Sequence, residues 1–226
     1  AYATYIECIK NGVTTIFDHH ASYGYIPGSL FEIADVAKEM GIRSCLCYEV
    51  SDRDGDVKCR QAIKENYDFI KHCKENPDPM LKAMFGLHAL FTLSDDKIEK
   101  CVEANNGMTG FHIHVSEGIN DVQDTWEKYE KRPVERLKDM NILGPKTILG
   151  HCIHVNDHEM NIIKETDTMV VNNPESNMGN AVGCSPVINL YNRGILIGLG
   201  TDAYTHDMTE SLKAALAIQR HNTKMP

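Results

Sequence analysis

The 226-residue sequence lacks a run of about 18 apolar residues, an Asn-x-Ser/Thr glycosylation sequon and anything resembling a signal peptide. These absences argue against a membrane-spanning or secreted protein, and we expect a cytoplasmic location. Positive charge is also scarce, with 23 Lys and Arg against 32 Asp and Glu, for a formal net charge of −9. Such a surface offers no basic field to nucleic acid or anionic lipid, so we expect a small-molecule partner.

No Cys-x-x-Cys pair occurs among the eight cysteines. A chain of this length with 42% apolar residues does not need disulfides to fold, so reduced thiols are expected. Cys45 and Cys47 alternate on a β-like run, where a core position is favoured over a metal role. Linkers and low-complexity segments are also lacking, which favours one domain over residues 1–226.

Apolar runs of strand type alternate with helical patterns along the whole chain. Strands are expected over residues 13–17, 42–50, 81–87, 110–115, 147–150, 169–172 and 195–200. Helices are expected over residues 2–10, 29–40, 57–73, 94–104, 122–140 with an interruption at Pro133, 157–165, 185–193 and 209–220, and a polar loop follows residue 172. This alternation predicts an α/β fold with a parallel sheet.

Polar groups end nearly every expected strand. They are His19 or His20, Glu49, His88, His114, His151, Asn172 and Asp202. An open doubly wound sheet often carries a glycine-rich turn after its first strand, and neither a G-x-G-x-x-G nor a P-loop motif is present. A ring of strand ends aimed at one point instead predicts a (β/α)8 barrel of the TIM type. One strand is lacking, so we expect an incomplete barrel holding strands 2 to 8.

His114, His151 and Asp202 are the natural metal ligands, because neutral imidazole and carboxylate bind Zn²⁺ and harder divalent ions. The alternative for a single strand-end histidine is a hydrogen-bonded core residue, but three candidates on three strands favour a site. Glu117 can reach the same cavity as a proton shuttle, or it can be a solvated loop acid. His112 shares a strand face with His114, and only one of the two need be a ligand.

Six motifs in register resemble the amidohydrolase superfamily. They are Gly12-Val13-Thr14-Thr15, Gly86-Leu87-His88-Ala89, His112-x-His114-x-x-Glu117, Gly150-His151-Cys152, Asn173-Pro174-x-Ser176-Asn177 and Gly200-Thr201-Asp202. The nearest branch resembles the cytosine/guanine deaminases and triazine hydrolases. Segments 47–55 and 174–180 are similar, more narrowly, to aminohydrolases associated with selenium-dependent purine metabolism.

The resemblance implies a metal-dependent hydrolase of C–N bonds that deaminates a purine- or pyrimidine-like heterocycle. It implies that His114 and Asp202 bind the metal, and that His151 orients or activates the attacking water and is a ligand in some members. Asp202 and Glu117 would move protons. His88 would contact the substrate, and Asn177 lies in a loop expected to shape the substrate mouth. Zinc is the expected ion, with iron or manganese as alternatives.

The family takes two further ligands from a His-x-His on its first strand, and no such motif lies upstream of Val13. We therefore expect the first strand and a flanking β-sandwich to lie outside this chain, and a homo-oligomer in the full-length protein. Two alternatives stay open. One is hydrolytic dechlorination or N-dealkylation with the same groups, and the other is a catalytically silent fragment that only binds a metabolite.

Overall fold

A computed structural model describes residues 1–224, and the chain divides into two compact units, Ala1–Ile113 and His114–Pro226. We call these unit 1 and unit 2 and describe each by itself. Strand β5 (Phe111–Val115) crosses the boundary, so its first residues belong to unit 1 and its last two to unit 2.

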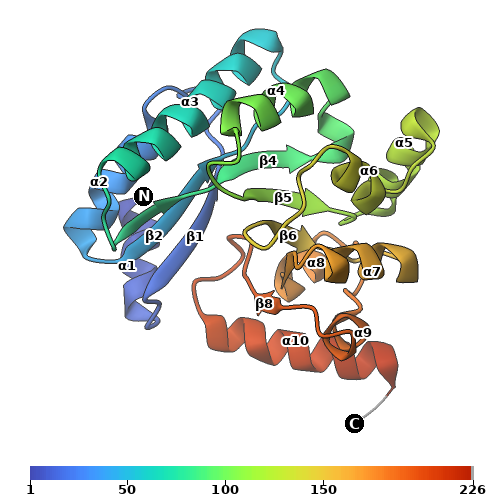
Figure 1. The fold of residues 1–226 in the computed structure, drawn as a ribbon. Coiled ribbons are helices and arrows are strands. Elements are labelled where there is room, and N and C mark those ends of the chain that lie inside the picture. The colour runs from blue at the N-terminus through green and yellow to red at the C-terminus, as the bar shows by residue number, and fades with distance from the viewer. Residues whose placement is uncertain (225–226) are drawn as a thin grey trace. The chain divides into compact units, whose positions relative to one another are not determined.

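Unit 1 alternates strands and helices (Figure 1). Its elements before β5 are α1 (Tyr2–Lys10), β1 (Thr15–His20), α2 (Ser29–Met40), β2 (Arg43–Tyr48), α3 (Asp56–Glu75), β3 (Leu81–Ala83), β4 (Phe85–Ala89), a 3-10 turn (Leu90–Thr92) and α4 (Asp95–Asn105). β1 pairs in parallel with β2, and β2 with β3. Helices α2 and α3 pack on β2, where Leu30, Leu46 and Phe69 are fully buried.

The run expected as one strand over residues 81–87 is two strands, β3 and β4, and the buried side chain of Asn66 explains the break. From α3, Asn66 accepts hydrogen bonds at Oδ1 from the backbone N–H groups of Tyr48 (2.9 Å) and Gly86 (3.2 Å). Its amide donates to the Tyr48 carbonyl at 2.8 Å. The ladder resumes beyond this point, where Val50 pairs with Leu87. One amide therefore replaces the strand-to-strand bonds where β2 and β4 separate.

Unit 2 continues the alternation with shorter elements (Figure 1). After β5 come α5 (Ile119–Tyr129), α6 (Pro133–Asp139), β6 (Ile148–His151), α7 (Asp157–Glu165), β7 (Met169–Asn172), α8 (Pro174–Gly179), α9 (Val187–Asn192), β8 (Ile197–Leu199) and α10 (Met208–Thr223). Strands β6, β7 and β8 are parallel neighbours, and Cys152 donates its backbone N–H to Val115 at the end of β5. The carboxyl ends of β5, β6, β7 and β8 therefore lie at one edge of unit 2.

Most expected elements are present with small shifts of boundary. Strand 169–172 and helix 157–165 have the expected bounds, and helix 122–140 is divided as expected, with Pro133 at the first position of α6. Besides the divided strand 81–87, two expectations were wrong. The strand expected over residues 13–17 runs from Thr15 to His20, and the loop expected after residue 172 contains helix α8.

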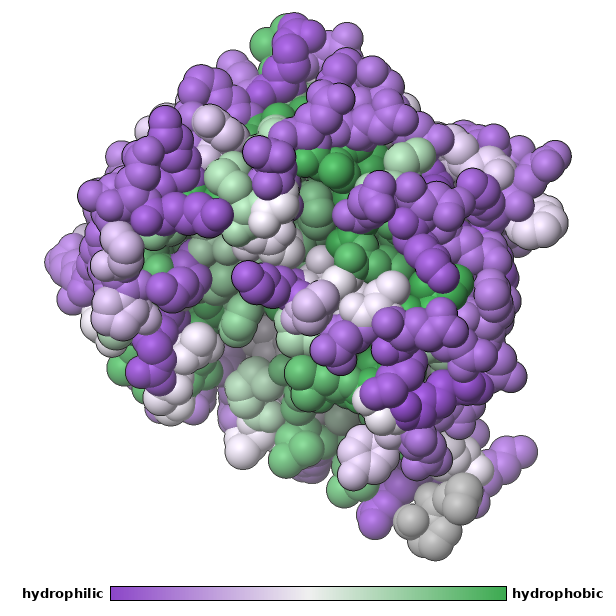
Figure 2. Space-filling model, in the orientation of Figure 1, coloured by the Kyte–Doolittle hydropathy of each residue, from purple (hydrophilic) through white to green (hydrophobic). Residues whose placement is uncertain are grey.

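Among residues 1–224, no helix combines the length and apolar character needed to span a membrane. The eight cysteines, all within those residues, are free thiols. On the face drawn in Figure 2 hydrophilic residues predominate, and hydrophobic side chains emerge in patches between them. In unit 2, the exposed apolar residues include Leu196 before β8 and Leu212 and Leu216 on α10.

Candidate functional site

The three predicted metal ligands come together in unit 2. His114 is on β5, His151 ends β6, and Asp202 follows β8. Each offers one ligand atom, and these atoms lie within 4.8 Å of one another. The two imidazole rings are 5.5 Å apart at their centroids. The parallel strands bring these residues together, although 88 positions separate the first from the last in the sequence.

His151 is fully buried, and its orientation is fixed by a chain of two amides. Its Nδ1 lies 2.7 Å from Oδ1 of Asn177, whose Nδ2 donates to Oδ1 of Asn172 at 3.2 Å. Since Asn177 then presents an oxygen to the ring, we assign the proton of neutral His151 to Nδ1. Its Nε2 is buried without a hydrogen-bond partner among the described residues. The lone pair on Nε2 is therefore available to a ligand.

That free nitrogen faces two carboxylates. Nε2 is 3.7 Å from Oε2 of Glu117 and 4.0 Å from Oδ2 of Asp202. These gaps are too long for strong hydrogen bonds. Two ligands of one zinc ion, with bonds of about 2.0–2.2 Å, lie no more than about 4.4 Å apart. The 4.0 Å between His151 Nε2 and Asp202 Oδ2 is within this limit, and an ion bound there would give Nε2 the partner that it lacks among the described residues. His114, His151 and Asp202 therefore fit a divalent cation.

Helix α8 and the residue after it hold both carboxylates. Ser176 donates its hydroxyl to Oδ2 of Asp202 at 2.5 Å, and Asn180 donates its amide to Oε1 of Glu117 at 3.1 Å. The Tyr204 hydroxyl donates to Oδ1 of Asn180 at 2.9 Å. With the Asn177 contact to His151, this short segment positions three predicted catalytic side chains. Sequence reasoning missed Ser176 and Asn180, because their roles depend on a helix expected to be a loop.

The backbone at these strand ends is in the left-handed region, which non-glycine residues rarely adopt. His151 and Cys152 have φ of 67° and 50°, and Asp202 and Ala203 have 49° and 60°. Ser116, after β5, has a φ of 48°. Each such residue costs about 1–2 kcal/mol, so the surrounding contacts must stabilise these turns.

The remaining predicted residues lie elsewhere or have other contacts. His88 belongs to unit 1, where its Nδ1 is 2.8 Å from the Thr92 hydroxyl. His112, also in unit 1, lies beside His19, whereas His114 is grouped with His151 and Asp202. Asn177 is buried, with its amide bonded to His151 and Asn172. Substrate contact by His88 and Asn177 stays a prediction.

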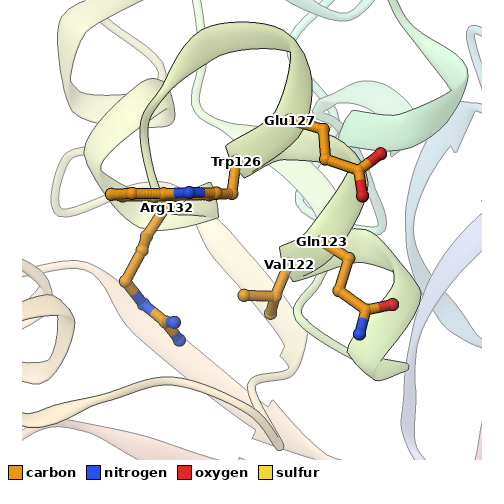
Figure 3. A pocket seen from close by; sticks show the side chains of 5 residues that line it. All are labelled: Val122, Gln123, Trp126, Glu127 and Arg132. Carbon is orange, nitrogen blue, oxygen red and sulfur yellow. The ribbon is translucent and has the colours of Figure 1, made fainter.

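A surface hollow on α5 involves none of these groups. Figure 3 shows Val122, Gln123, Trp126 and Glu127 of α5 around it, with Arg132 from the following turn. Arg132 is engaged there, since its Nε donates to the buried Glu159 carboxylate at 2.7 Å and Nη2 donates to the His154 carbonyl. These hydrogen bonds stabilise the loop between β6 and α7. The residues that line the hollow include none of the predicted catalytic or metal-binding residues.

Comparison with known proteins gives the family. Residues 3–226 match the amidohydrolase family, and the chain belongs to it. It is 35% identical over 226 residues to 5'-deoxyadenosine deaminase of Methanobrevibacter smithii, covering 98% of this chain and 50% of that protein. It is 33% identical to 5-methylthioadenosine/S-adenosylhomocysteine deaminase of Thermoanaerobacter pseudethanolicus, covering 87% and 44%. The chain thus spans about half the length of these relatives.

Solved structures share the fold at lower identity. An adenosine deaminase from Xanthomonas campestris with bound zinc superposes with a TM-score of 0.86 at 21% identity, covering 99% of this chain and 51% of that one. A guanine deaminase from C. acetobutylicum with bound guanine also gives 0.86, at 18% identity and coverages of 98% and 55%. The expected α/β barrel class is confirmed, and the chain corresponds to part of such a barrel.

Proposed function

We propose that the full-length protein carrying this chain is a metal-dependent hydrolase that removes the amino group from a purine- or pyrimidine-like heterocycle. The observation that carries the proposal is the grouping of His114, His151 and Asp202, in which Nε2 of His151 has no hydrogen-bond partner within residues 1–224. The names of the relatives, which are deaminases of 5'-modified adenosines, support an aminopurine nucleoside as the first substrate class to test.

A divalent ion held by His114, His151 and Asp202 would act as a Lewis acid. It would activate water for attack and stabilise the negative charge that develops in the transition state. We propose zinc, in keeping with the ion bound in the adenosine deaminase from Xanthomonas campestris. Iron and manganese suit the same ligands, so metal analysis of the purified protein decides between them.

Asp202 is the proposed base. Its Oδ2 accepts the Ser176 hydroxyl, which fixes the carboxylate at the end of β8. Water adds to the ring carbon that carries the amine, and its proton passes to Asp202. Nε2 of His151 faces the Asp202 carboxylate, and the hydrogen bond between Nδ1 and Asn177 keeps the ring oriented. Asp202 then returns the proton to the departing amine as the C–N bond breaks, so the products are ammonia and the ring carbonyl.

Glu117 is the proposed acid toward the ring. One of its oxygens is held by Asn180, and the other lies 3.7 Å from His151 Nε2. A carboxyl group placed there can protonate a ring nitrogen while water attacks the adjacent carbon, and it can accept the proton of the new hydroxyl group as the amine leaves, which gives the ring carbonyl.

A steady-state assay tests the proposal. The full-length protein, loaded with zinc, is given 5'-deoxyadenosine, adenosine, guanine, cytosine and triazines, and the released small molecule is identified. Ammonia from an amino-substituted ring supports deamination, whereas halide or alkylamine from a triazine would establish the dechlorinase or N-dealkylase alternative. A protein that binds one of these compounds without converting it, and that contains less than a tenth of an equivalent of metal, would support the remaining alternative. In that alternative the protein binds a metabolite and has no catalytic activity.

Three sequence predictions accompany this proposal. They are a single barrel domain over residues 1–226 that holds strands 2 to 8, a homo-oligomer and a cytoplasmic location. The last two residues of that domain lie outside the described part of the chain. Size-exclusion chromatography of the full-length protein tests the oligomer.

A further inference from the structure

A second group of potential ligands lies within unit 1. His19 on β1, Cys47 on β2 and His112 on β5 each direct one donor atom into a space where all three atoms lie within 4.8 Å. Cys47 Sγ is 3.6 Å from Nδ1 of His19 and 3.9 Å from Nδ1 of His112. The two imidazole rings meet edge to face, with centroids 4.6 Å apart. None of these residues belongs to the site in unit 2.

The spacing matches the ligand shell of a tetrahedral ion. Bonds of about 2.3 Å to thiolate sulfur and about 2.0–2.1 Å to imidazole nitrogen, at the tetrahedral angle, separate the two atoms by about 3.6 Å. The observed separations of 3.6 and 3.9 Å agree with this value. A thiol without an ion has one proton, and Cys47 Sγ also lies 3.5 Å from the Asp18 carbonyl oxygen. The thiol can donate that proton to one neighbour, and it accepts from an imidazole only where Nδ1 carries a proton.

The surroundings suit a bound soft cation. Cys47 is buried, and burial raises the pKa of its thiol well above the usual range, so the thiol keeps its proton unless positive charge is brought to it. Glu49 Oε2 lies 3.8 Å from Nε2 of His19, on the side of the ring away from Cys47. That carboxylate is itself held by Tyr23 and Arg53. At 3.8 Å the gap is too long for a hydrogen bond, and the carboxylate adds negative charge beside a histidine that would bind a cation.

We propose that His19, Cys47 and His112 form a second cation site in this protein, selective for a thiophilic ion, with Zn²⁺ as the ion it takes. The Cys47 thiol loses its proton to solvent when the ion binds, and one thiolate and two imidazoles hold the metal. Because the three ligands come from β1, β2 and β5, the ion would tie together strands that are distant in sequence. Its role is structural, and it does not depend on the proposed deaminase activity.

Cobalt substitution tests the proposal directly. A thiolate bound to Co²⁺ gives a ligand-to-metal charge-transfer band in the near ultraviolet, and a site made only of histidine and carboxylate gives none. The full-length protein titrated with Co²⁺ should develop this band with a stoichiometry of one thiolate-bound ion per chain. Cys47→Ser should abolish the band and lower total bound cobalt by one equivalent.

Two control variants separate the sites. Cys45→Ser, two residues earlier on β2, should keep the band, and Asp202→Asn, which alters the site in unit 2, should keep it as well. X-ray absorption of the unsubstituted protein loaded with zinc covers the case in which Cys47→Ser fails to fold, and a sulfur shell at about 2.3 Å is expected. Absence of both the cobalt band and the sulfur shell overturns the proposal, and so does a band that survives Cys47→Ser.

Discussion

Asp202 has two roles in the proposed reaction, since it binds the ion and accepts a proton from water, and a substitution can separate them. Asp202→Asn keeps a possible oxygen ligand and the Ser176 contact while removing the basic group. We expect kcat/KM to fall by about 10²–10⁴-fold with metal content near that of the unsubstituted enzyme. Steady-state kinetics and metal analysis of the same preparation measure both.

Glu117→Gln is the matched variant for the second carboxylate. It should lose activity to a similar extent with metal fully retained, since Glu117 is proposed to contact substrate. If Asp202→Asn keeps more than about half of the original activity, the assignment of the base is wrong.

Asn177 acts on His151 without touching the reacting atoms in the proposed mechanism. Asn177→Ala removes the acceptor at Nδ1, so the imidazole loses its fixed orientation and tautomer. Loss of such an outer partner typically weakens metal affinity by about 10–100-fold. Competition with a chromophoric chelator measures the affinity, and nitrogen NMR of the His151 side chain reports the tautomer.

Asn177→Asp supplies the control, because it keeps an oxygen facing Nδ1. Its metal affinity should stay well above that of Asn177→Ala. Unchanged affinity and an unchanged tautomer in Asn177→Ala would show that the bond has no positioning role.

Of the candidate site, the sequence could predict the groups that end strands. His114, His151 and Asp202 follow apolar runs, and parallel strands carry such residues to a common edge whatever their exact twist. Ser176 and Asn180 could not be found in that way. Their contacts depend on side-chain directions along α8, which neither spacing nor residue type determines.

At the scale of elements, the division between β3 and β4 depends on one amide. Asn66→Ala would leave the backbone N–H groups of Tyr48 and Gly86 without their acceptor inside the protein. Each buried unsatisfied group costs about 1–3 kcal/mol, so we expect a loss of about 2–5 kcal/mol in the free energy of unfolding. Urea denaturation followed by circular dichroism measures it.

Gln61, on the exposed face of the same helix, provides the comparison. Gln61→Ala should change the free energy of unfolding by less than about 0.5 kcal/mol. Equal effects of the two substitutions would mean that Asn66 contributes only helix propensity.

Helix α8 shows why some elements escape prediction from sequence. Its six residues are too few to be stable alone, and Asn-Pro with Ser, Asn and Gly is typical of a turn. Tertiary contacts hold it instead, since Glu175 accepts a hydrogen bond from Ser211 of α10 and Gly179 lies against the Tyr204 ring. By contrast, α7 has an Asn156 cap that the sequence displays, and its bounds were predicted correctly.

For the whole molecule, a bound ion should add stability because the unfolded chain cannot assemble the ligands. At a free zinc concentration of about 100 times Kd, one site stabilises the folded state by about 2.7 kcal/mol. For a chain of this size we expect the midpoint of thermal unfolding to rise by about 5–10 °C. Differential scanning calorimetry with and without chelator measures the shift.

His114→Ala should remove much of that zinc-dependent rise, because it deletes one ligand of the site in unit 2. A midpoint that does not respond to zinc in the unsubstituted full-length protein would argue against metal binding to the native state at either site.

The left-handed backbone at Ser116, His151, Cys152, Asp202 and Ala203 concentrates conformational cost at the ends of β5, β6 and β8. Substitution of Cys152 or Ala203 by glycine would lower that cost, because glycine adopts the same backbone conformation without steric penalty. Any such change also loosens the turns that aim His151 and Asp202. Selection for thermal stability alone would therefore replace these residues first. If a lineage keeps them, the strained turns are retained because catalysis requires them.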